Sequence, residues 1–398
     1  MRQQLITFRE FKLMSLTILL AICGSLGVDI HLASLPHIMT YMHTTRPHMQ
    51  QSVTFFILGV GLSMLVYGPL SDKVGRKPVV IFGLCLACIA SYSAAFVQSI
   101  MPFLILRILQ GVGSGVCWGL GRIIAADVMH GERLAAIGSY FTLFLSLSPL
   151  LAPALGGYIQ HWFGWQANFI LLGSIILFAL IFFILFFEET NKHRRPEAFA
   201  LFSLVKTYAS FFQNRLFIGC ALLTGIAMSA NIFYTTISSF IFQNQFHTTP
   251  IVFGWLTAVV GAAGVIGKLF SPFFILRLKN QKTLFLGIAL LLSSGIFLSI
   301  FTFSGYISIA TVLAGVSIAI FALVFIGSIT MAMALSPFHD KRGSAGALFG
   351  SFQLLISFAF SAIVATFPHL GTNTLAGAYV VLGLLGFVCY FGLVRNAR

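Results

Sequence analysis

The chain has 398 residues and a mass of 43.4 kDa, with 58% hydrophobic and only 8% charged residues. Soluble domains average about 25% charged residues, so nine Asp and Glu residues are too few to solvate a globule of this size. This composition excludes soluble enzymes, disordered chains and nucleic-acid-binding proteins. It predicts a polytopic membrane protein whose surface faces lipid.

Twelve apolar stretches along the chain are long enough to cross a membrane. A spanning helix needs about 20 apolar residues, and lipid offers no partners for backbone N–H and C=O groups, which requires closed helices. The sequence therefore predicts an all-α fold with twelve transmembrane helices. The first six spans are expected at 13–37, 52–71, 78–97, 102–126, 135–158 and 167–187, and the last six at 216–241, 252–276, 283–303, 306–334, 344–367 and 374–394.

Basic residues gather on one side of these spans. Of the 23 Lys and Arg residues, 19 fall in the termini and loops of that side, whereas the opposite loops hold only Arg46. Cytoplasmic loops carry an excess of basic residues, so we expect both termini to be cytoplasmic. The same asymmetry explains the net charge of +14 without a nucleic-acid partner. Three basic residues remain inside spans: Arg107, Arg122 and Lys268.

A polar segment at 188–215 divides the chain into two halves, 1–187 and 216–398, with six expected spans each. In both halves a glycine-rich second span runs into a short basic turn, at 72–77 and at 277–282. Paired halves with a site between them are typical of secondary transporters that work by alternating access. One chain then has enough helices to enclose a path, so we expect a monomer.

The strongest motif is residues 68–78, GPLSDKVGRKP, in the turn after the second span. Glycines permit a tight hairpin, and Asp72 can meet a helix N-terminus or an arginine. Such a contact stabilises one conformation and must break in another. The segment closely resembles the loop between helices 2 and 3 of the major facilitator superfamily. The resemblance implies two pseudo-symmetric six-helix bundles and a gating role for Gly68, Asp72, Gly75, Arg76 and Lys77.

Three further segments resemble the proton-coupled drug exporters of the Bcr/CflA type within that superfamily. They are RILQGVGSG at 107–115, APALGG at 152–157, and ALSPF at 334–338 followed by GSAGALFG at 343–350. The second resembles an antiporter motif, in which Pro153, Gly156 and Gly157 kink a helix and permit close packing. Plain structural packing explains these three residues equally well. The resemblance implies a multi-pass protein of the bacterial inner membrane that exchanges its cargo for protons.

Asp29 is the only one of the nine acidic residues expected well inside a span. A carboxylate in hydrocarbon is costly and is a functional candidate by default, and residues 29–36, DIHLASLP, resemble the family segment whose acid handles protons or substrate. At 1.5 Å per residue, Asp29 lies about 24 Å from the start of its helix, and Arg107 lies at about the same depth. We expect Arg107 to hold Asp29 charged until a proton or cargo separates them. Alternatively, Asp29 has only a structural partner and Arg107 only braces helices.

Several polar residues inside the spans are candidates to line a cargo cavity. Arg122, in RIIAAD at 122–127, either lies near the cavity or pairs with Asp127 or Glu132. Lys268 either extends to the membrane surface or faces the cavity and attracts an anion. His31 is either a local polar substitution or a second proton carrier. The expected cavity residues are His31, Gln110, Arg122, Tyr140, Asn231, Tyr234, Lys268 and Gln353.

These features predict a secondary transporter that exports a small organic molecule, such as a drug or toxic compound, in exchange for protons. No ATP-binding loop, metal motif or catalytic triad stands out, so we expect no enzyme activity, cofactor or metal. Three intramembrane basic residues oppose one acid, and His31 and Ala33 replace the family's Tyr and Pro. Export of a carboxylate metabolite such as a siderophore, or proton-linked import, therefore stays an alternative. A membrane enzyme or receptor is disfavoured.

Overall fold

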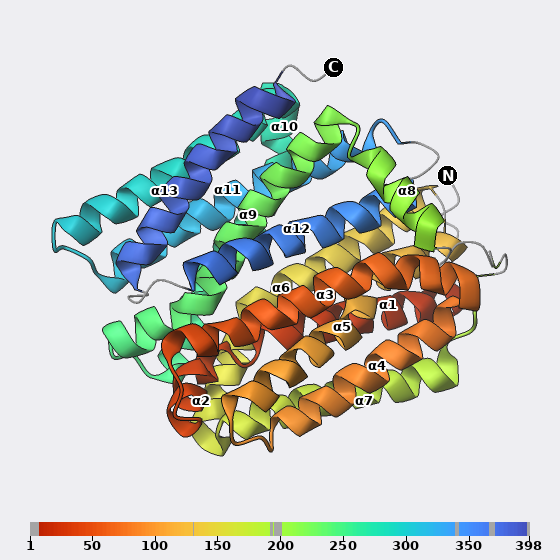
Figure 1. The fold of residues 1–398 in the computed structure, drawn as a ribbon, viewed down its shortest axis with the longest axis horizontal. Coiled ribbons are helices and arrows are strands. Elements are labelled where there is room, and N and C mark those ends of the chain that lie inside the picture. The colour runs from red at the N-terminus through yellow and green to blue at the C-terminus, as the bar shows by residue number, and fades with distance from the viewer. Residues whose placement is uncertain are drawn as a thin grey trace.

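The computed structural model describes residues 8–129, 131–191, 194, 201–338, 342–365 and 371–395 (Figure 1). Every regular element in these residues is helical. The first half contains α1 (Phe8–Asp29), η1 (Leu32–Ser34), α2 (Leu35–Tyr41), α3 (Arg46–Val74), α4 (Arg76–Ala94), α5 (Ile100–Val128), α6 (Gly131–Phe163) and α7 (Trp165–Phe186). The rest contains α8 (Leu201–Phe211), α9 (Arg215–Phe240), η3 (Ile241–Gln245), α10 (Pro250–Phe303), α11 (Ile309–Leu335), α12 (Arg342–Val364), α13 (Thr372–Cys389) and η5 (Tyr390–Val394).

Eleven helices in the described residues are long and apolar enough to cross a membrane. One of them, α10, has 54 residues and is interrupted at Lys279, whose φ of 63° and ψ of 163° are not helical. α10 therefore provides two crossings, one on either side of the kink, and the chain makes the twelve crossings that the sequence predicts. The turn expected at 277–282 is reduced to this kink.

The first span differs from the uninterrupted helix expected at 13–37. α1 ends at Asp29, a short 3-10 turn follows at Leu32–Ser34, and α2 then begins at Leu35. One physical reason is Pro36, which has no N–H to donate and therefore cannot continue the hydrogen-bond pattern of α1. The break places Asp29 at the end of a helix within the span, and the sequence did not predict this.

The segment between the halves contains a helix that the sequence did not predict. α8 lies at an angle to the spans, at the right of Figure 1. Its Tyr208 hydroxyl donates to the carbonyl oxygen of Leu65 at 3.0 Å, and its buried Phe211 packs against Phe217 and Phe338. We call the end of the bundle that carries α8 and the 72–77 turn the basic end.

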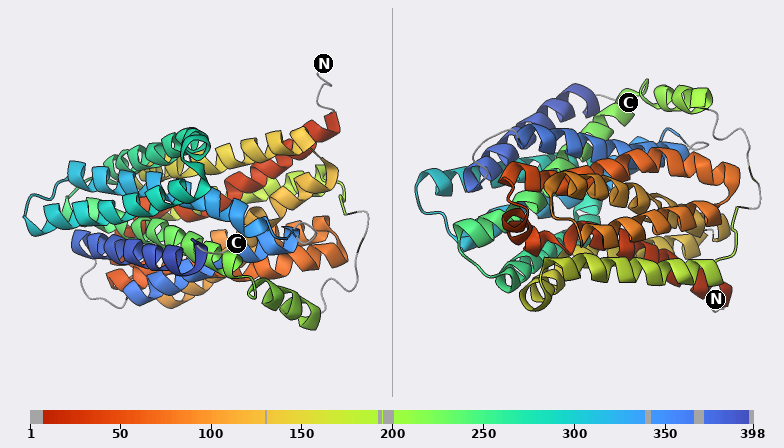
Figure 2. Two further views of the ribbon diagram at one scale, coloured as in Figure 1. Left: turned by 90° about the horizontal axis from the view of Figure 1, so that it is seen from above. Right: turned by 60° about the horizontal axis from the view of Figure 1, so that its bottom comes forward.

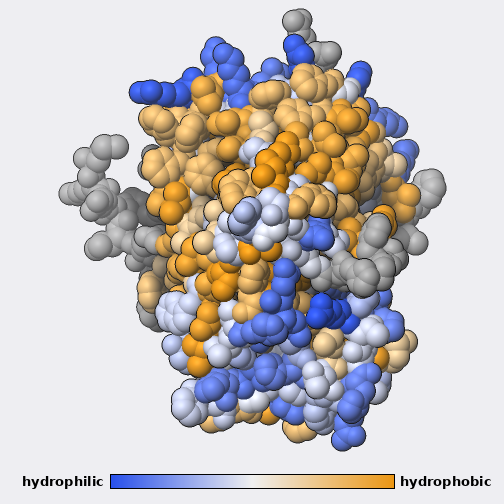
Figure 3. Space-filling model, turned by 90° about the vertical axis from the view of Figure 1, so that its left-hand side faces the viewer, coloured by the Kyte–Doolittle hydropathy of each residue, from blue (hydrophilic) through white to orange (hydrophobic). Residues whose placement is uncertain are grey.

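The spans pack as two groups of helices that lie against each other. In Figures 1 and 2, α1 and α3–α7 lie on one side and α9–α13 on the other. Large apolar side chains are exposed on the outside, among them Leu276, Phe163 and Val388, which are 83%, 77% and 70% exposed. On the face drawn in Figure 3, hydrophobic side chains form a broad area over the upper half and hydrophilic ones gather below. That the halves move as separate bodies stays a prediction.

The two halves contact each other closely at the end opposite the basic end. A Cβ atom at Gly254 on α10 would lie only 2.5 Å from Cα of Ala154 on α6, so the two backbones approach as closely as glycine allows. Between α3 and α12, the hydroxyls of Thr54 and Ser361 are hydrogen-bonded at 2.9 Å. These contacts close the bundle there, and the space between the halves lies nearer the basic end.

Replacing Gly254 by valine tests this close approach. The new side chain would collide with Ala154 and with the carbonyl oxygen of Pro153, 2.7 Å from an added Cβ. Overpacking of this kind costs about 1–3 kcal/mol. We expect Gly254→Val to lower the thermal unfolding midpoint of the detergent-purified protein. Gly377→Val is the matched control because nothing lies within 4 Å of a Cβ there; equal midpoints for both variants would contradict the close packing.

Candidate functional site

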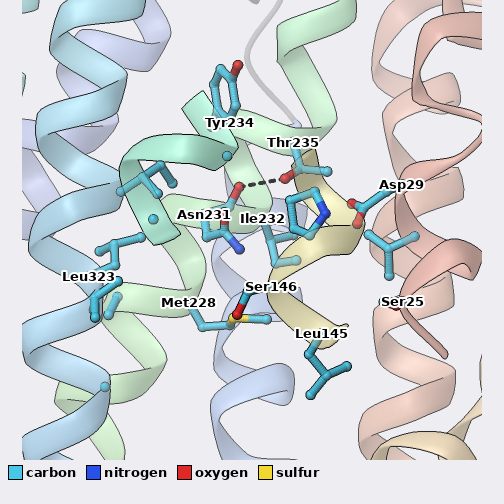
Figure 4. A pocket seen from close by; sticks show the side chains of 18 of the residues that line it. Ser25, Asp29, Leu145, Ser146, Met228, Asn231, Ile232, Tyr234, Thr235 and Leu323 are labelled. Atoms are coloured by element: carbon cyan, nitrogen blue, oxygen red, sulfur yellow. Dashed lines mark hydrogen bonds between the residues drawn. The ribbon is translucent and has the colours of Figure 1, made fainter. Parts of the chain in front are cut away.

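A cavity of about 770 Å³ lies between the two halves. Its walls come from α1, α5 and α6 of the first half and from α9, α10, α11 and α12 of the second. Most of its surface is apolar, with Leu323 and Met228 among the side chains that face it (Figure 4). A large apolar pocket with a few polar groups is the usual form of a small-molecule site, so this cavity is the candidate cargo site.

Asp29 lies in the wall of this cavity, where α1 ends. Its side chain is only 8% exposed, and the Ser148 hydroxyl donates to Asp29 Oδ2 at 3.0 Å. Figure 4 shows Asp29 opposite Asn231 and Thr235 of α9, where the Thr235 hydroxyl donates to the carbonyl oxygen of Asn231 at 3.0 Å. The acid predicted from the sequence therefore faces the other half across the cavity, with only one hydrogen-bond partner from its own half.

Arg107 does not pair with Asp29, which corrects the sequence-based expectation. Its guanidinium is fully buried and donates to the carbonyl oxygens of Gly27, at 3.2 Å from both terminal nitrogens, and of Ser52, at 3.1 Å. It also donates to Gln110 Oε1. Neither the described Arg107 nor Gln110 lines the cavity. The depth estimate was close, since Gly27 is two residues from Asp29, but backbone carbonyls compete successfully for the guanidinium in this conformation.

His31 also lies away from the cavity, so its expected place in the cavity wall is wrong. The ring is fully buried and packs against Phe169, with the ring centroids 5.4 Å apart. Within the described part of the chain, neither ring nitrogen has a hydrogen-bond partner. His31 follows Asp29 at the break in the first span, and its side chain packs on α7 through Phe169.

Asn168 on α7 connects the break in the first span to α6, and sequence reasoning missed it. Its Nδ2 donates to Ser34 Oγ at 2.8 Å and to the carbonyl oxygen of Gly156 at 3.2 Å. A Cβ at Gly156 would lie 1.8 Å from the carbonyl oxygen of Ile30. Gly156 of the predicted antiporter motif thus permits α6 to contact the break, and the hydrogen bonds of Asn168 stabilise this contact. A lone Asn in an apolar helix was the available signal.

The remaining sequence candidates divide into three groups. Tyr140 lies outside the side chains that the structure describes. Gly157 packs against the carbonyl oxygen of Pro250, which lies 2.3 Å from an added Cβ, and so serves the contact between the halves. The other cavity candidates line the cavity, and so does Pro153 of the expected antiporter motif: Arg122, Asn231, Tyr234, Lys268, Gln353 and Pro153.

The predicted gating loop forms an ion-pair network at the basic end. Arg76 lies 2.5 Å from Asp72 and 2.9 Å from Asp127, and it donates to Ser71 Oγ at 2.6 Å. Asp127 therefore pairs with Arg76 rather than with Arg122, the other arginine considered from the sequence. Gly75 adopts a φ of 110°, which side chains rarely tolerate.

The two other members of the gating motif have different surroundings. Lys77 Nζ donates to the carbonyl oxygen of Ile184 at 3.0 Å, which connects the loop to α7. Nothing lies within 4 Å of a Cβ at Gly68, so packing in this conformation does not require glycine there. The network, including Lys77, lies within the first half.

Glu189, just after α7, caps the start of α4 and was also missed. Its carboxylate accepts from the backbone N–H groups of Arg76 at 2.8 Å and Lys77 at 3.0 Å. Burial acts to raise the pKa of Glu189, but these N–H groups, that of Asn191 and the charge of Arg194 hold the pKa below its usual range. An anion at a helix N-terminus also matches the helix dipole. This cap connects the 188–215 segment to the gating loop.

The described residues contain no group of three or more His, Cys, Asp or Glu side chains that could hold a metal ion. The site therefore consists of an apolar cavity between two six-helix groups, an acid in its wall and an ion-pair network at one end. A family model for the Major Facilitator Superfamily matches residues 17–361. The chain belongs to the major facilitator superfamily. It is a multi-pass secondary transporter and not an enzyme.

Similar proteins agree with this membership. The chain is 28% identical to the multidrug resistance protein MdtL of Shewanella oneidensis over 83% of each chain. It is 25% identical to the bicyclomycin resistance protein homolog of Haemophilus influenzae over 96% of each, and 25% identical to multidrug resistance protein D of Escherichia coli over 98% of this chain and 97% of the other. The fold matches that of the Escherichia coli xylose transporter XylE with a TM-score of 0.75, at 13% identity over 98% of each chain.

Replacing Asn168 by leucine tests the contact at the break. The change leaves Ser34 and the Gly156 carbonyl without their donor, and an unsatisfied buried group costs about 1–3 kcal/mol. We expect a lower thermal unfolding midpoint and a changed pH dependence of Asp29 modification by dicyclohexylcarbodiimide, measured by mass spectrometry. Ser174→Ala, which removes an exposed hydroxyl on the same helix, is the control. An unchanged modification profile in Asn168→Leu would show that the break does not depend on this contact.

Replacing Glu189 by glutamine tests the cap on α4. Because the folded pKa of Glu189 lies below its usual value, its stabilising effect is complete above about pH 4.3 and is lost as the pH falls through the folded pKa. At pH 7 we expect Glu189→Gln to be less stable by about 1 kcal/mol, since solvent screens a partly exposed carboxylate. Unfolding midpoints between pH 7 and pH 3 should converge at the acid end. A constant difference at all pH values would contradict this assignment.

Proposed function

We propose that this chain is a proton-coupled transporter that exports a small organic molecule by alternating access. The observation that carries the proposal is Asp29, an acid in the cavity wall at a break within a membrane span. An ionisable group at such a position is costly unless it has a function. Binding of a proton changes the charge of the wall that cargo touches, so proton and cargo each affect the state in which the other binds.

The mechanism that fits this arrangement couples Asp29 to the movement of the two halves. The acid belongs to the first half and faces α9 of the second half across the cavity. With Asp29 ionised, closing the cavity around it would remove a charge from water, whereas protonation reduces that cost. Proton binding therefore shifts the equilibrium between the two conformations, in which the cavity opens to one side of the membrane or to the other. Cargo shifts the same equilibrium because it binds one of these conformations more tightly.

Arg107 and the gating loop have supporting roles in this proposal. Arg107 ties Gly27 and Ser52 together beside the break and positions the end of α1 without touching the cavity. In the described residues, the ion pairs of Arg76 join it to Asp72 and Asp127 of the first half. In the opposite facing, we propose that members of the gating loop exchange contacts with the second half. A contact that is present in only one of the two conformations stabilises that conformation relative to the other.

The relatives support a proposal for the class of cargo and for the cellular location. Several are named multidrug resistance proteins, and all of those reported above come from bacteria. We therefore propose a drug or toxic compound as cargo, antiport with protons, the bacterial inner membrane as the location, and a monomer as the working unit. Export of a carboxylate metabolite and proton-linked import use the same cavity and the same acid. They differ from the main proposal in the cargo and in the direction of net transport.

Asp29→Asn tests the proposal directly. In everted membrane vesicles that have built a proton gradient, addition of an exported compound from a panel of dyes and antibiotics should release protons from wild-type vesicles. The release is followed with a pH-sensitive dye. The variant keeps the shape of the side chain but cannot ionise, so we expect at least a roughly ten-fold loss of proton release, equivalent to about 1.4 kcal/mol of coupling.

Glu10→Gln is the matched control, because it makes the same acid-to-amide change on the same helix but outside the cavity. It should release protons as the wild type does. Wild-type proton release by Asp29→Asn would refute the role of this acid, and cargo movement that ignores a collapsed pH difference would refute proton coupling altogether.

A further inference from the structure

Two positively charged side chains and one acid line the described part of the cavity. The acid is Asp29, and the cations are Arg122 of α5 and Lys268 of α10, one from each half. Arg107, the third basic residue within the spans, is turned into the first half and held by backbone carbonyls. Among the side chains that the structure describes, basic groups on the cavity wall thus outnumber acidic ones by two to one.

The position of Lys268 is not that of a residue at a membrane surface. It precedes the kink at Lys279 by eleven residues, which is about 16 Å at the helical rise and about half the thickness of a hydrocarbon core. Arg122 precedes the end of α5 by six residues, or about 9 Å. The usual explanation for an intramembrane lysine, extension to the nearest interface, does not apply to Lys268, because its amine is held within the cavity.

Lys268 has a neutral hydrogen-bond partner in this structure. Its Nζ donates to the hydroxyl of Ser146 on α6, two residues from Ser148, which holds Asp29. No acidic side chain of the described residues forms an ion pair with Lys268 within 4 Å. The amine of Lys268 would bind a negatively charged group of a solute more strongly than it binds the neutral Ser146 hydroxyl, because a charge-assisted hydrogen bond is stronger.

The apolar walls beside these cations complete the site. Ile320, Leu323, Val324 and Met331 of α11 line the cavity together with Lys268, and Trp118 of α5 lines it together with Arg122. A solute complementary to this surface has an apolar, preferably aromatic, body and one negatively charged group that accepts hydrogen bonds. A lipophilic cation would meet one acid and two repelling charges.

We propose that the cargo is an amphipathic organic anion, with a carboxylate or a similar acidic group bound by Lys268 and its apolar body on α11. This inference rests on the proposed function, and it assigns to Lys268 the role of a specificity-determining residue. Arg122 lines the same cavity, six residues before the end of α5. Asp29 on α1 remains the proton site, and its partner Ser148 lies two residues from Ser146, the partner of Lys268.

The test is equilibrium binding of three matched probes to the purified full-length protein, with no proton gradient present. Radiolabelled 1-naphthoate, 1-naphthamide and 1-naphthylmethylammonium share one aromatic body and differ in charge. We expect wild-type protein to bind the acid at least about ten-fold more tightly than the amide, and the ammonium probe most weakly. That ratio is equivalent to about 1.4 kcal/mol, a modest value for a charge-assisted bond.

Variants then assign the preference to Lys268. Lys268→Met should bind the acid and the amide equally, and Lys268→Arg should keep the preference. Lys206→Met, which removes an exposed lysine of α8 outside the cavity, should behave as the wild type and so excludes a general effect of net charge. Unfolding midpoints verify that each variant is folded, and Lys268→Arg gives a second measurement if the methionine variant is unstable.

Several outcomes overturn the cargo class: no binding of naphthoate by the wild type, equal binding of naphthoate and naphthamide, or an unchanged preference in Lys268→Met. Because the binding assay needs no gradient, it separates this inference from the proposed function. Loss of the anion preference while proton release still depends on Asp29 refutes only the cargo class. An anion preference without any proton release refutes only proton coupling.

Discussion

A carboxylate inside a membrane span is the constraint on which the rest of this structure depends. Hydrocarbon cannot solvate the charge of Asp29, so the protein must provide a cavity, a hydrogen bond or a proton. The structure provides the first two, through the space between the halves and the hydroxyl of Ser148. The third, a proton, is what a transporter can exchange with the solution. The close packing of Gly254 against Ala154 closes the end of the bundle opposite the basic end.

The break after Asp29 connects this constraint to the motifs of the first half. Gly156 permits the backbone at Ile30 to approach α6, Asn168 holds Ser34, and Arg107 holds Gly27. These contacts lie on both sides of the break and involve the carbonyls of Gly27 and Ile30 and the hydroxyl of Ser34. Broken helices within a membrane persist only where protein or a cavity satisfies such groups. The antiporter motif and the arginine of α5 therefore act on one structural feature, although they are far apart in the sequence.

The sequence was sufficient to predict the features that depend on local composition. Apolar length predicts the twelve crossings, and the scarcity of acids singles out Asp29. The orientation that the basic residues indicate stays a prediction. The sequence was insufficient to predict contacts in which groups far apart in the chain compete for one side chain. Arg107 was expected to bind the nearest opposite charge, but the carbonyl oxygens of Gly27 beside the break and of Ser52 on α3 and the side chain of Gln110 bind it instead. Asn168 and Glu189 bind groups more than a hundred residues away. The lone Asn in an apolar helix marks Asn168 as unusual, but no local pattern indicates which groups either residue binds.

The kink at Lys279 has a consequence for the surroundings of the protein. Only one residue with non-helical geometry separates the two crossings of α10, so there is no flexible loop to absorb a change in the tilt of either one. The crossing before Lys279 carries Lys268 in the cavity wall, and the crossing after it exposes Phe285 and Ile296 on the outside. A membrane segment adjusts its tilt to bilayer thickness. The acyl-chain length of the surrounding phospholipids is thereby mechanically connected to the cavity wall.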